Sequence, residues 1–170
     1  PSYRLDRAVG LLDGAVVLGS TSLSTEIANP EATGAGAANP AIGPVEGAPV
    51  AWVNSEPSRL AVMTLGSAQP RDVPIAGVTA PSIDRFGVVW ASSTDAPGVV
   101  WAVAPGREPV QVPVPFDGEV AAVRVSPDGS RALLLTRGSA GSQVWLATIR
   151  RNDVDAQYSF EAVTELDLFP

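Results

Sequence analysis

The sequence of 170 residues contains no cysteine and no histidine, and it contains no lysine, because all 11 of its basic residues are arginine. Without cysteine and histidine the chain has no thiol nucleophile, no disulfide and no zinc-finger spacing, and it lacks the commonest general base of enzymes. The absence of cysteine does not indicate a redox compartment, because large β domains do not need covalent cross-links. Thiol, histidine and zinc-finger chemistry are therefore excluded.

Positive charge is also scarce. The chain has 18 acidic residues against 11 basic ones, which gives a formal net charge of −7. An acidic surface repels phosphate backbones, so we do not expect nucleic acid as a partner. We interpret the acidic excess as a feature that favours solubility.

Long apolar runs are missing as well. No stretch approaches the roughly 18–20 residues of a membrane span, and no basic-then-apolar leader opens the chain. The sequence starts at Pro1 and not at methionine, which indicates a piece of a longer protein whose signal or anchor would lie upstream. We therefore expect no membrane span within this sequence.

Short apolar runs, in contrast, are abundant and are separated by turn residues. The chain has 16 glycines and 16 prolines, 45% hydrophobic residues and only 17% charged residues. This composition excludes wholesale disorder and favours many short strands joined by tight turns over long helices.

The stretch from Val78 to Arg150 reads as one unit written twice, with an offset of 44 residues. A period near 44 built of short β-rich runs is typical of a four-stranded propeller blade, which needs about 40–45 residues. The identities that carry this repeat pair Ser82 with Ser126, Asp84 with Asp128, Ala96 with Ala140, Val100 with Val144 and Trp101 with Trp145.

An earlier copy of the unit precedes these two. Asn39-Pro40-Ala41-Ile42 stands before Val50-Ala51-Trp52, much as Ala80-Pro81-Ser82-Ile83 stands before Val88-Val89-Trp90. The offset between the copies drifts, which places small insertions in the loops, where they are tolerated. Prolines recur in the outermost strand of the earliest copy, at Pro74, and of the copy that follows it, at Pro113, as expected for sheet edges.

We therefore predict an all-β fold, a partial β-propeller with about three four-stranded antiparallel blades plus leading strands. The blades are expected at about 34–76, 78–114 and 120–166. Residues 1–33 are expected to hold leading strands with a hairpin turn at Asp13-Gly14, which could be the last strands of a preceding blade, and a loop that continues over 20–36. The expected strands are 35–42, 50–54, 59–65 and 71–75, then 78–81, 87–92, 98–104 and 109–114, then 120–126, 131–136, 143–150 and 160–166, with a polar insertion at 151–158.

The four tryptophans fit this model. Trp101 and Trp145 share one repeat position, and we assign Trp52 and Trp90 to another. Large aromatics are expected to fill the wedge between stacked blade faces, although stacking on a ligand is an alternative for them. Truncating a buried tryptophan to alanine costs on the order of 3–5 kcal/mol.

The acidic residues offer few candidates for chemistry. We predict that Asp84 and Asp128 cap turns by accepting backbone N–H groups, the second in a type I turn over Ser126-Pro127-Asp128-Gly129; the alternative is a cation ligand. Glycosidases built on propellers use two carboxylates several ångströms apart. No spacing singles out such a pair among the remaining candidates, which are Glu56, Asp72, Asp95 and Asp117.

Other catalytic motifs are incomplete. The chain has no Gly-x-Ser-x-Gly motif, and Gly34-Ala35-Gly36 lacks the lysine and hydroxyl residue of a phosphate loop. The only adjacent basic pair, Arg150-Arg151, could touch anionic lipid or a partner carboxylate, but we interpret it as a solvated strand end. We predict no catalytic, cofactor-binding or metal-binding residue.

Two segments resemble one known family. Residues 80–90, APSIDRFGVVW, are similar to the "PS-x-D-x-x-G-x-x-W" signature of the actinobacterial lipoprotein LpqB family, and residues 123–132, VRVSPDGSRA, are similar to a later blade of that family. The resemblance covers about residues 48–151. It implies an exported, lipid-anchored protein whose C-terminal β-propeller follows a GerMN-type module.

The resemblance also implies a role. Proteins of this family associate with the extracytoplasmic part of a sensor histidine kinase and tune a two-component system for cell-envelope homeostasis and division. We therefore expect a non-enzymatic interaction module whose open sheet edges could also pair with another copy. The alternatives are a propeller that binds or processes envelope glycans, and a structural spacer.

Overall fold

Strands and turns make up the described part of the chain. The computed structural model describes residues 7–12, 15–20, 37–44, 49–55, 58–64, 70–139, 141–152, 154–155 and 157–167. No helix within these ranges has the length and hydrophobicity to cross a membrane. The Asp13-Gly14 turn, the loop over 21–36 and Gly34-Ala35-Gly36 lie outside the described residues.

Three four-stranded antiparallel sheets follow a short hairpin of β1 (Arg7–Leu12) and β2 (Ala15–Ser20). In each sheet the strands pair in the order of the sequence, as a propeller blade requires. The first sheet holds β3 (Ala37–Ile42), β4 (Val50–Ser55), β5 (Ser58–Met63) and β6 (Arg71–Ala76); the second holds β7 (Ser82–Ile83), β8 (Val89–Ser92), β9 (Val99–Val103) and β10 (Val110–Pro113); the third holds β11 (Glu119–Val125), β12 (Arg131–Gly138), β13 (Gly141–Asn152) and β14 (Gln157–Leu166).

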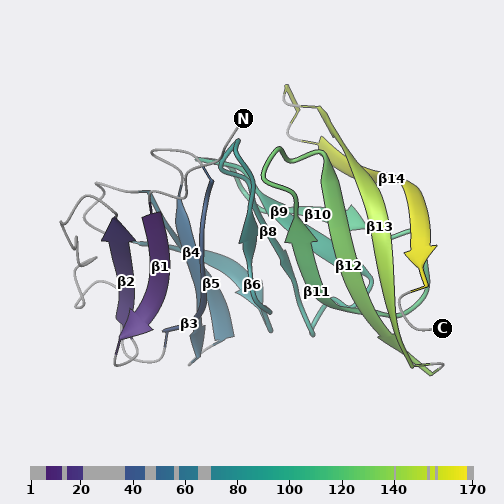
Figure 1. Cartoon of the computed structure of the whole chain (residues 1–170), viewed down its shortest axis with the longest axis horizontal. Coiled ribbons are helices and arrows are strands. Elements are labelled where there is room, and N and C mark those ends of the chain that lie inside the picture. The colour runs from purple at the N-terminus through teal and green to yellow at the C-terminus, as the bar shows by residue number, and fades with distance from the viewer. Residues whose placement is uncertain are drawn as a thin grey trace.

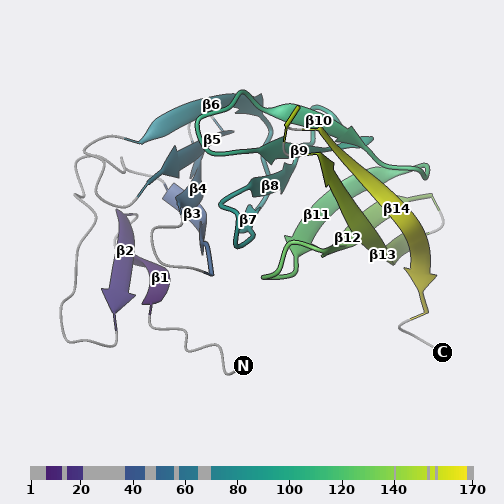
Figure 2. The same cartoon turned by 90° about the horizontal axis from the view of Figure 1, so that it is seen from above.

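The sheets stand side by side along an arc (Figures 1 and 2). The first strands of the sheets, β3, β7 and β11, lie on the concave side of the arc, and β6 and β10 lie on its convex side (Figure 2). Contacts agree with this arrangement, since β7 touches both β3 and β11, and β10 touches β14. The predicted all-β fold with a partial propeller of four-stranded blades is confirmed.

Two apolar clusters fill the spaces between neighbouring sheets. One cluster lies between the first and second sheets and includes Leu60, Val73 and Ala91. The other lies between the second and third sheets and includes Trp90 and Leu134. The alternation of strand side chains produces both clusters, because successive residues of the middle sheet point to its opposite faces.

The predicted edge positions of two prolines are confirmed. Pro74 lies in β6 and Pro113 in β10, the outer edge strands of their sheets, and both side chains are exposed. A proline at an edge removes an N–H that could pair with another chain.

The ladder register corrects one of the tryptophan assignments. Ile42 pairs with Val50 and Ile83 pairs with Val89, so the residue equivalent to Trp52 is Ala91 and not Trp90. A shift of one residue turns a side chain to the opposite face of a sheet. Trp90 accordingly faces the third sheet, whereas Trp52 faces away from the second sheet.

The repeat position predicted to be shared by Trp101 and Trp145 is confirmed. Ala91 pairs with Trp101, and Leu134 pairs with Trp145 at the same place in the third sheet. Trp101 is partly buried against the cluster between the first and second sheets, and Trp145 is partly buried against the cluster between the second and third sheets.

Two strand predictions were wrong at their boundaries. The inner strand of the second blade was expected at 78–81, but β7 comprises only Ser82–Ile83, preceded by a single bridge between Val78 and Ser93. Pro81 has no N–H to donate, which limits a regular ladder there. The polar insertion expected at 151–158 is shorter, because β13 runs to Asn152 and β14 begins at Gln157.

Two neighbouring leucines of β12 provide a test of the stacked faces. Leu134 is fully buried against the second sheet, whereas Leu133 points to the other face of the third sheet and is 43% exposed. We expect Leu134→Ala to lower the free energy of unfolding by about 2–5 kcal/mol, and Leu133→Ala to lower it by less than about 1 kcal/mol. Urea unfolding of both variants measures the difference; equal losses would contradict the assigned faces.

Candidate functional site

Two turns from neighbouring blades lie against each other. One joins β7 to β8, with the Gly87 N–H donating to the Asp84 carbonyl over 3.0 Å; the other joins β11 to β12, with the Gly129 N–H donating to the Ser126 carbonyl over 2.8 Å. The Arg85 N–H donates to the Pro127 carbonyl over 2.9 Å and connects the two turns. The turn predicted at Ser126–Gly129 is confirmed, and Gly129 has the expected positive φ of 71°.

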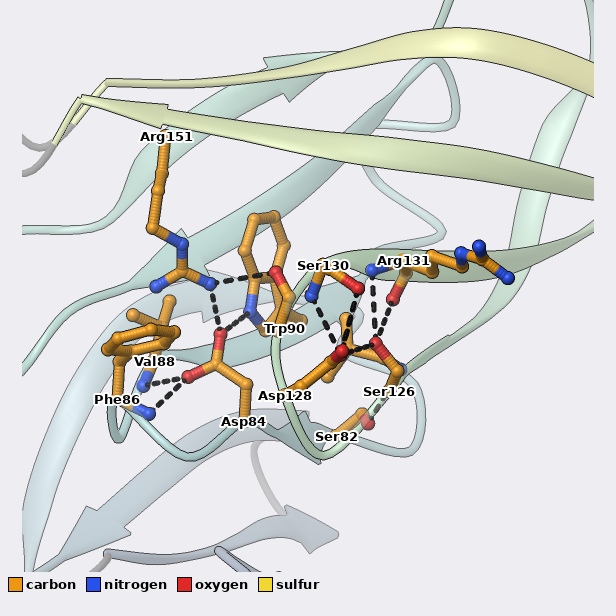
Figure 3. Close-up of polar contacts among 12 residues, drawn as sticks. Ser82, Asp84, Phe86, Val88, Trp90, Ser126, Asp128, Ser130, Arg131 and Arg151 are labelled. Carbon is orange, nitrogen blue, oxygen red and sulfur yellow. Dashed lines mark hydrogen bonds and ion pairs between the residues drawn. The ribbon is translucent and has the colours of Figure 1, made fainter.

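A buried carboxylate organises these turns (Figure 3). Asp84 is fully buried, and its Oδ1 accepts the N–H groups of Phe86 at 2.9 Å and Val88 at 3.2 Å. Its Oδ2 accepts the indole N–H of Trp90 at 3.0 Å and the Nη2 of Arg151 at 2.7 Å. The predicted turn-capping role of Asp84 is confirmed, and the carboxylate also joins the second sheet to the third.

Arg151 is the partner that the sequence did not reveal. Its side chain is only 13% exposed, so the prediction of a solvated strand end was wrong for this residue. The guanidinium lies over the ring of Phe86, 4.2 Å from its centroid, and its Nη2 also donates to the Gly129 carbonyl over 3.1 Å. A side chain at Gly129 would place its Cβ 2.6 Å from that Nη2, so glycine is required there for the ion pair as well as for the positive φ.

The neighbouring arginine behaves as predicted. Arg150 is 74% exposed and pairs with Glu161 at 3.0 Å on the surface. Such an exposed pair contributes little to stability.

Asp84 and Asp128 are not equivalent, which corrects the sequence alignment. The Asp84 N–H donates to the Val88 carbonyl as the Ser126 N–H donates to the Arg131 carbonyl, so Asp84 corresponds to Ser126. The turn of the third sheet contains one residue more than that of the second, and the β12–β13 connection contains a further one, so the gap-free alignment hid two insertions. Asp128 is exposed and accepts the backbone N–H of Ser130 at 3.0 Å, so its predicted turn-capping role is confirmed.

Hydrogen bonds from the Ser126 hydroxyl, and then from the backbone and hydroxyl of Ser130, lower the pKa of Asp128 from 3.8 to about 2. A carboxyl with a lowered folded-state pKa stabilises the fold above its unfolded pKa, and this stabilisation is lost as the pH falls through the folded pKa. We expect Asp128→Asn to weaken the dependence of stability on pH between about pH 4 and pH 2. Thermal midpoints of both proteins across this range measure the effect; parallel curves would contradict it.

Phe86 is the exposed aromatic of this region. It occupies the turn after β7 and is 45% exposed, and the guanidinium groups of Arg85 and Arg151 both lie over its ring, 4.8 Å and 4.2 Å from the centroid. Because Asp84 and Val88 fix the backbone on either side of it, the ring is presented from a rigid turn. Aromatic and arginine side chains together are the residues that most often anchor protein interfaces.

A cavity of about 430 Å³ lies beside this turn, where the inner strands of the three sheets converge. Its volume is in the range of ordinary ligand pockets. Its lining comes from β3, β7, β11 and the residues before β7, namely Asn39, Pro40, Ala41, Ile42, Ala80, Pro81, Ser82, Ile83 and Arg124. The sequence repeat Asn39-Pro40-Ala41-Ile42 and Ala80-Pro81-Ser82-Ile83 thus forms most of the wall, a role that sequence reasoning missed.

The remaining acidic candidates of the described residues lie on the surface. Asp72 is exposed on β6, Asp95 in the β8–β9 connection and Asp117 in the β10–β11 connection, and Glu56 lies outside the described residues. Within the described ranges, no group of three or more acidic residues could hold a metal ion. Trp52 and Trp90 are fully buried and so cannot stack on a glycan, although partial exposure remains at Trp101 and Trp145.

Comparison with known protein families shows to which family the chain belongs. The model of the lipoprotein LpqB beta-propeller domain matches residues 14–168. The chain belongs to this family. The LpqB resemblance predicted from residues 80–90 and 123–132 is therefore confirmed, and the match spans all three sheets. No curated protein matches the chain by sequence.

Solved structures show that the LpqB-type fold is shared with other proteins. The chain is similar to TolB from Acinetobacter baumannii, with a TM-score of 0.60 at 12% identity, covering 99% of this chain and 52% of TolB. It is also similar to hydrazine synthase of Kuenenia stuttgartiensis, with a TM-score of 0.58 at 16% identity, covering 90% and 43% of the two chains. A chain of a nidogen/laminin complex gives a TM-score of 0.58 at 8% identity, covering 92% and 61%.

Because the sequence identities to these three structures are low, the similarity shows a shared fold alone. The LpqB-type chain spans about half the length of the solved structures that it matches.

Proposed function

We propose that this chain is a non-enzymatic protein-interaction module of an exported, lipid-anchored envelope protein. Its partner is the extracytoplasmic domain of a sensor histidine kinase, and binding tunes a two-component system for cell-envelope homeostasis. The observation that carries this proposal is membership of the LpqB β-propeller family over residues 14–168. The binding mechanism is that of a rigid scaffold that presents loops to a partner.

The turn between β7 and β8 supplies the contact surface in this proposal. Phe86 is exposed there next to Arg85, while the buried Asp84 holds the turn in one conformation. Rigid anchors lose little conformational entropy on binding, which favours affinity. The partner surface would therefore offer a pocket for one aromatic ring, with carboxylates nearby for the arginine.

A pull-down with the purified extracytoplasmic domain of the sensor kinase tests this proposal. We expect the chain to capture the domain, and Phe86→Ala to weaken capture about five-fold or more, as removal of an interface anchor does. Val154→Ala is the matched control, because Val154 is an apolar residue that is 83% exposed at the β13–β14 connection. Capture no better than that by uncoated beads would overturn the proposed function.

A further inference from the structure

Among the described residues that line the cavity at the inner strands, Arg124 is the charged one, and the strand register explains its position. Ala41 pairs with Ala51, Ser82 with Trp90 and Arg124 with Leu133, so Ala41, Ser82 and Arg124 occupy the same ladder position in three successive blades. All three line the cavity. Two of the blades place a short side chain there, so that neither Ala41 nor Ser82 fills the space into which Arg124 extends.

The guanidinium of Arg124 is held at one end. Its Nη1 donates to the Ala80 carbonyl over 3.1 Å and to the Val123 carbonyl over 2.8 Å, which anchors the side chain between β11 and the segment before β7. No other described residue accepts a hydrogen bond from this side chain. The Nε and Nη2 groups therefore form a free edge, and this edge of a guanidinium matches the two oxygens of a carboxylate.

The remaining lining suits a peptide more than a polyanion. The lining residues that the structure describes include no acidic residue. Besides Arg124, their polar side-chain groups are the Asn39 amide and the Ser82 hydroxyl, and the rest are proline, alanine and isoleucine side chains. Asn39 is in the left-handed region with φ of 49°, a conformation that asparagine tolerates better than most residues. The net charge of −7 disfavours ligands with many negative charges, so a single carboxylate is the best match.

We propose that this cavity binds one carboxylate of a peptide segment of the partner, as an Asp or Glu side chain or as a C-terminus. Arg124 is the counter-ion, and the Pro40, Pro81 and Ile83 walls accept the apolar side chains next to that carboxylate. The inference rests on the proposed function in that the occupant is a polypeptide.

Selection from a displayed library of random peptides tests the site without knowledge of the partner. We expect peptides retained by the wild-type chain to be enriched in Asp, Glu or a free C-terminal carboxylate, and Arg124→Gln to abolish this enrichment. Arg137→Gln is the matched control, an exposed arginine of β12 outside the cavity that should retain the enrichment. Replacing the acidic residue of a selected peptide by its amide should weaken its binding about ten-fold or more.

A second variant separates loss of the site from loss of the fold. Ala41→Glu places a carboxylate at the equivalent position across the cavity, keeps Arg124 and should compete with acidic peptides from within. Circular dichroism and thermal midpoints of each variant verify folding. Peptides without acidic enrichment, or equal retention of acidic peptides by wild type and both cavity variants, would overturn the site.

The same variants distinguish this inference from the proposed function. If acidic peptides bind through Arg124 but the kinase domain is not captured, the proposed function fails and the site stands. If the wild-type chain and Arg124→Gln capture the kinase domain equally well, and the selected peptides show no acidic enrichment, the site fails and the proposed function stands.

Discussion

Replacing Asp84 with alanine is expected to lower the free energy of unfolding by about 3–5 kcal/mol, the cost of leaving one partner of a buried ion pair uncompensated. The substitution removes the acceptor for the Arg151 guanidinium, for the Trp90 indole and for the Phe86 and Val88 N–H groups. Because these groups come from two sheets, the loss should loosen the contact between the second and third blades. Urea unfolding measures the change.

Asp128→Ala is the control, since Asp128 caps the neighbouring turn but is exposed. Its effect at neutral pH should be much smaller than that of Asp84→Ala. A double-mutant cycle with Arg151→Met tests the pairing directly, because the double variant should cost less than the sum of the two single variants. Strict additivity would contradict the ion pair.

Truncating Trp90 to alanine is expected to cost about 3–5 kcal/mol, a large part of the roughly 5–15 kcal/mol that stabilises a typical domain. The indole is fully buried between the second and third sheets, with its centroid 5.2 Å from that of the Tyr158 ring and 6.1 Å from that of the Phe160 ring. Its loss would leave a cavity at the centre of the contact between these sheets.

Trp90→Phe separates packing from hydrogen bonding, since it keeps a ring but removes the N–H that Asp84 accepts at 3.0 Å. We expect it to cost about 1–3 kcal/mol. Trp145→Ala should cost less than Trp90→Ala, because Trp145 is only partly buried and stacks on Phe116 with centroids 4.6 Å apart. A Trp90→Ala chain as stable as the wild type would contradict the stacked-blade arrangement.

The sequence predicted the blades well because their signal is periodic. Short apolar runs recur at intervals near 44 residues, and turn residues such as Gly129 mark their ends, so strand positions in the second and third sheets were recoverable. Register was harder to predict. One additional residue in the β11–β12 turn and another in the β12–β13 connection separated Asp84 from its expected equivalent. A one-residue shift placed Trp52 and Trp90 on opposite faces.

The candidate site was less accessible to sequence reasoning. Arg151 follows Asp84 by 67 residues, and no local pattern distinguishes it from the exposed Arg150. Strand alternation was the available signal, because adjacent residues of a strand point to opposite faces. Arg124 could be singled out only from the strand pairing, which places it at the same ladder position as Ala41 and Ser82. The other two blades have small, uncharged residues at this position.

The central claim is that the inner strands and the turns beside them form the binding surface. Amide chemical-shift mapping of the chain, with the extracytoplasmic kinase domain or a selected acidic peptide added, tests it most directly. We predict that the largest shifts fall on β3, β7, β11 and the Asp84–Gly87 turn, with Ile83 and Arg124 among them. Shifts concentrated on the outer strands β6, β10 and β14, with the inner strands unchanged, would contradict the claim.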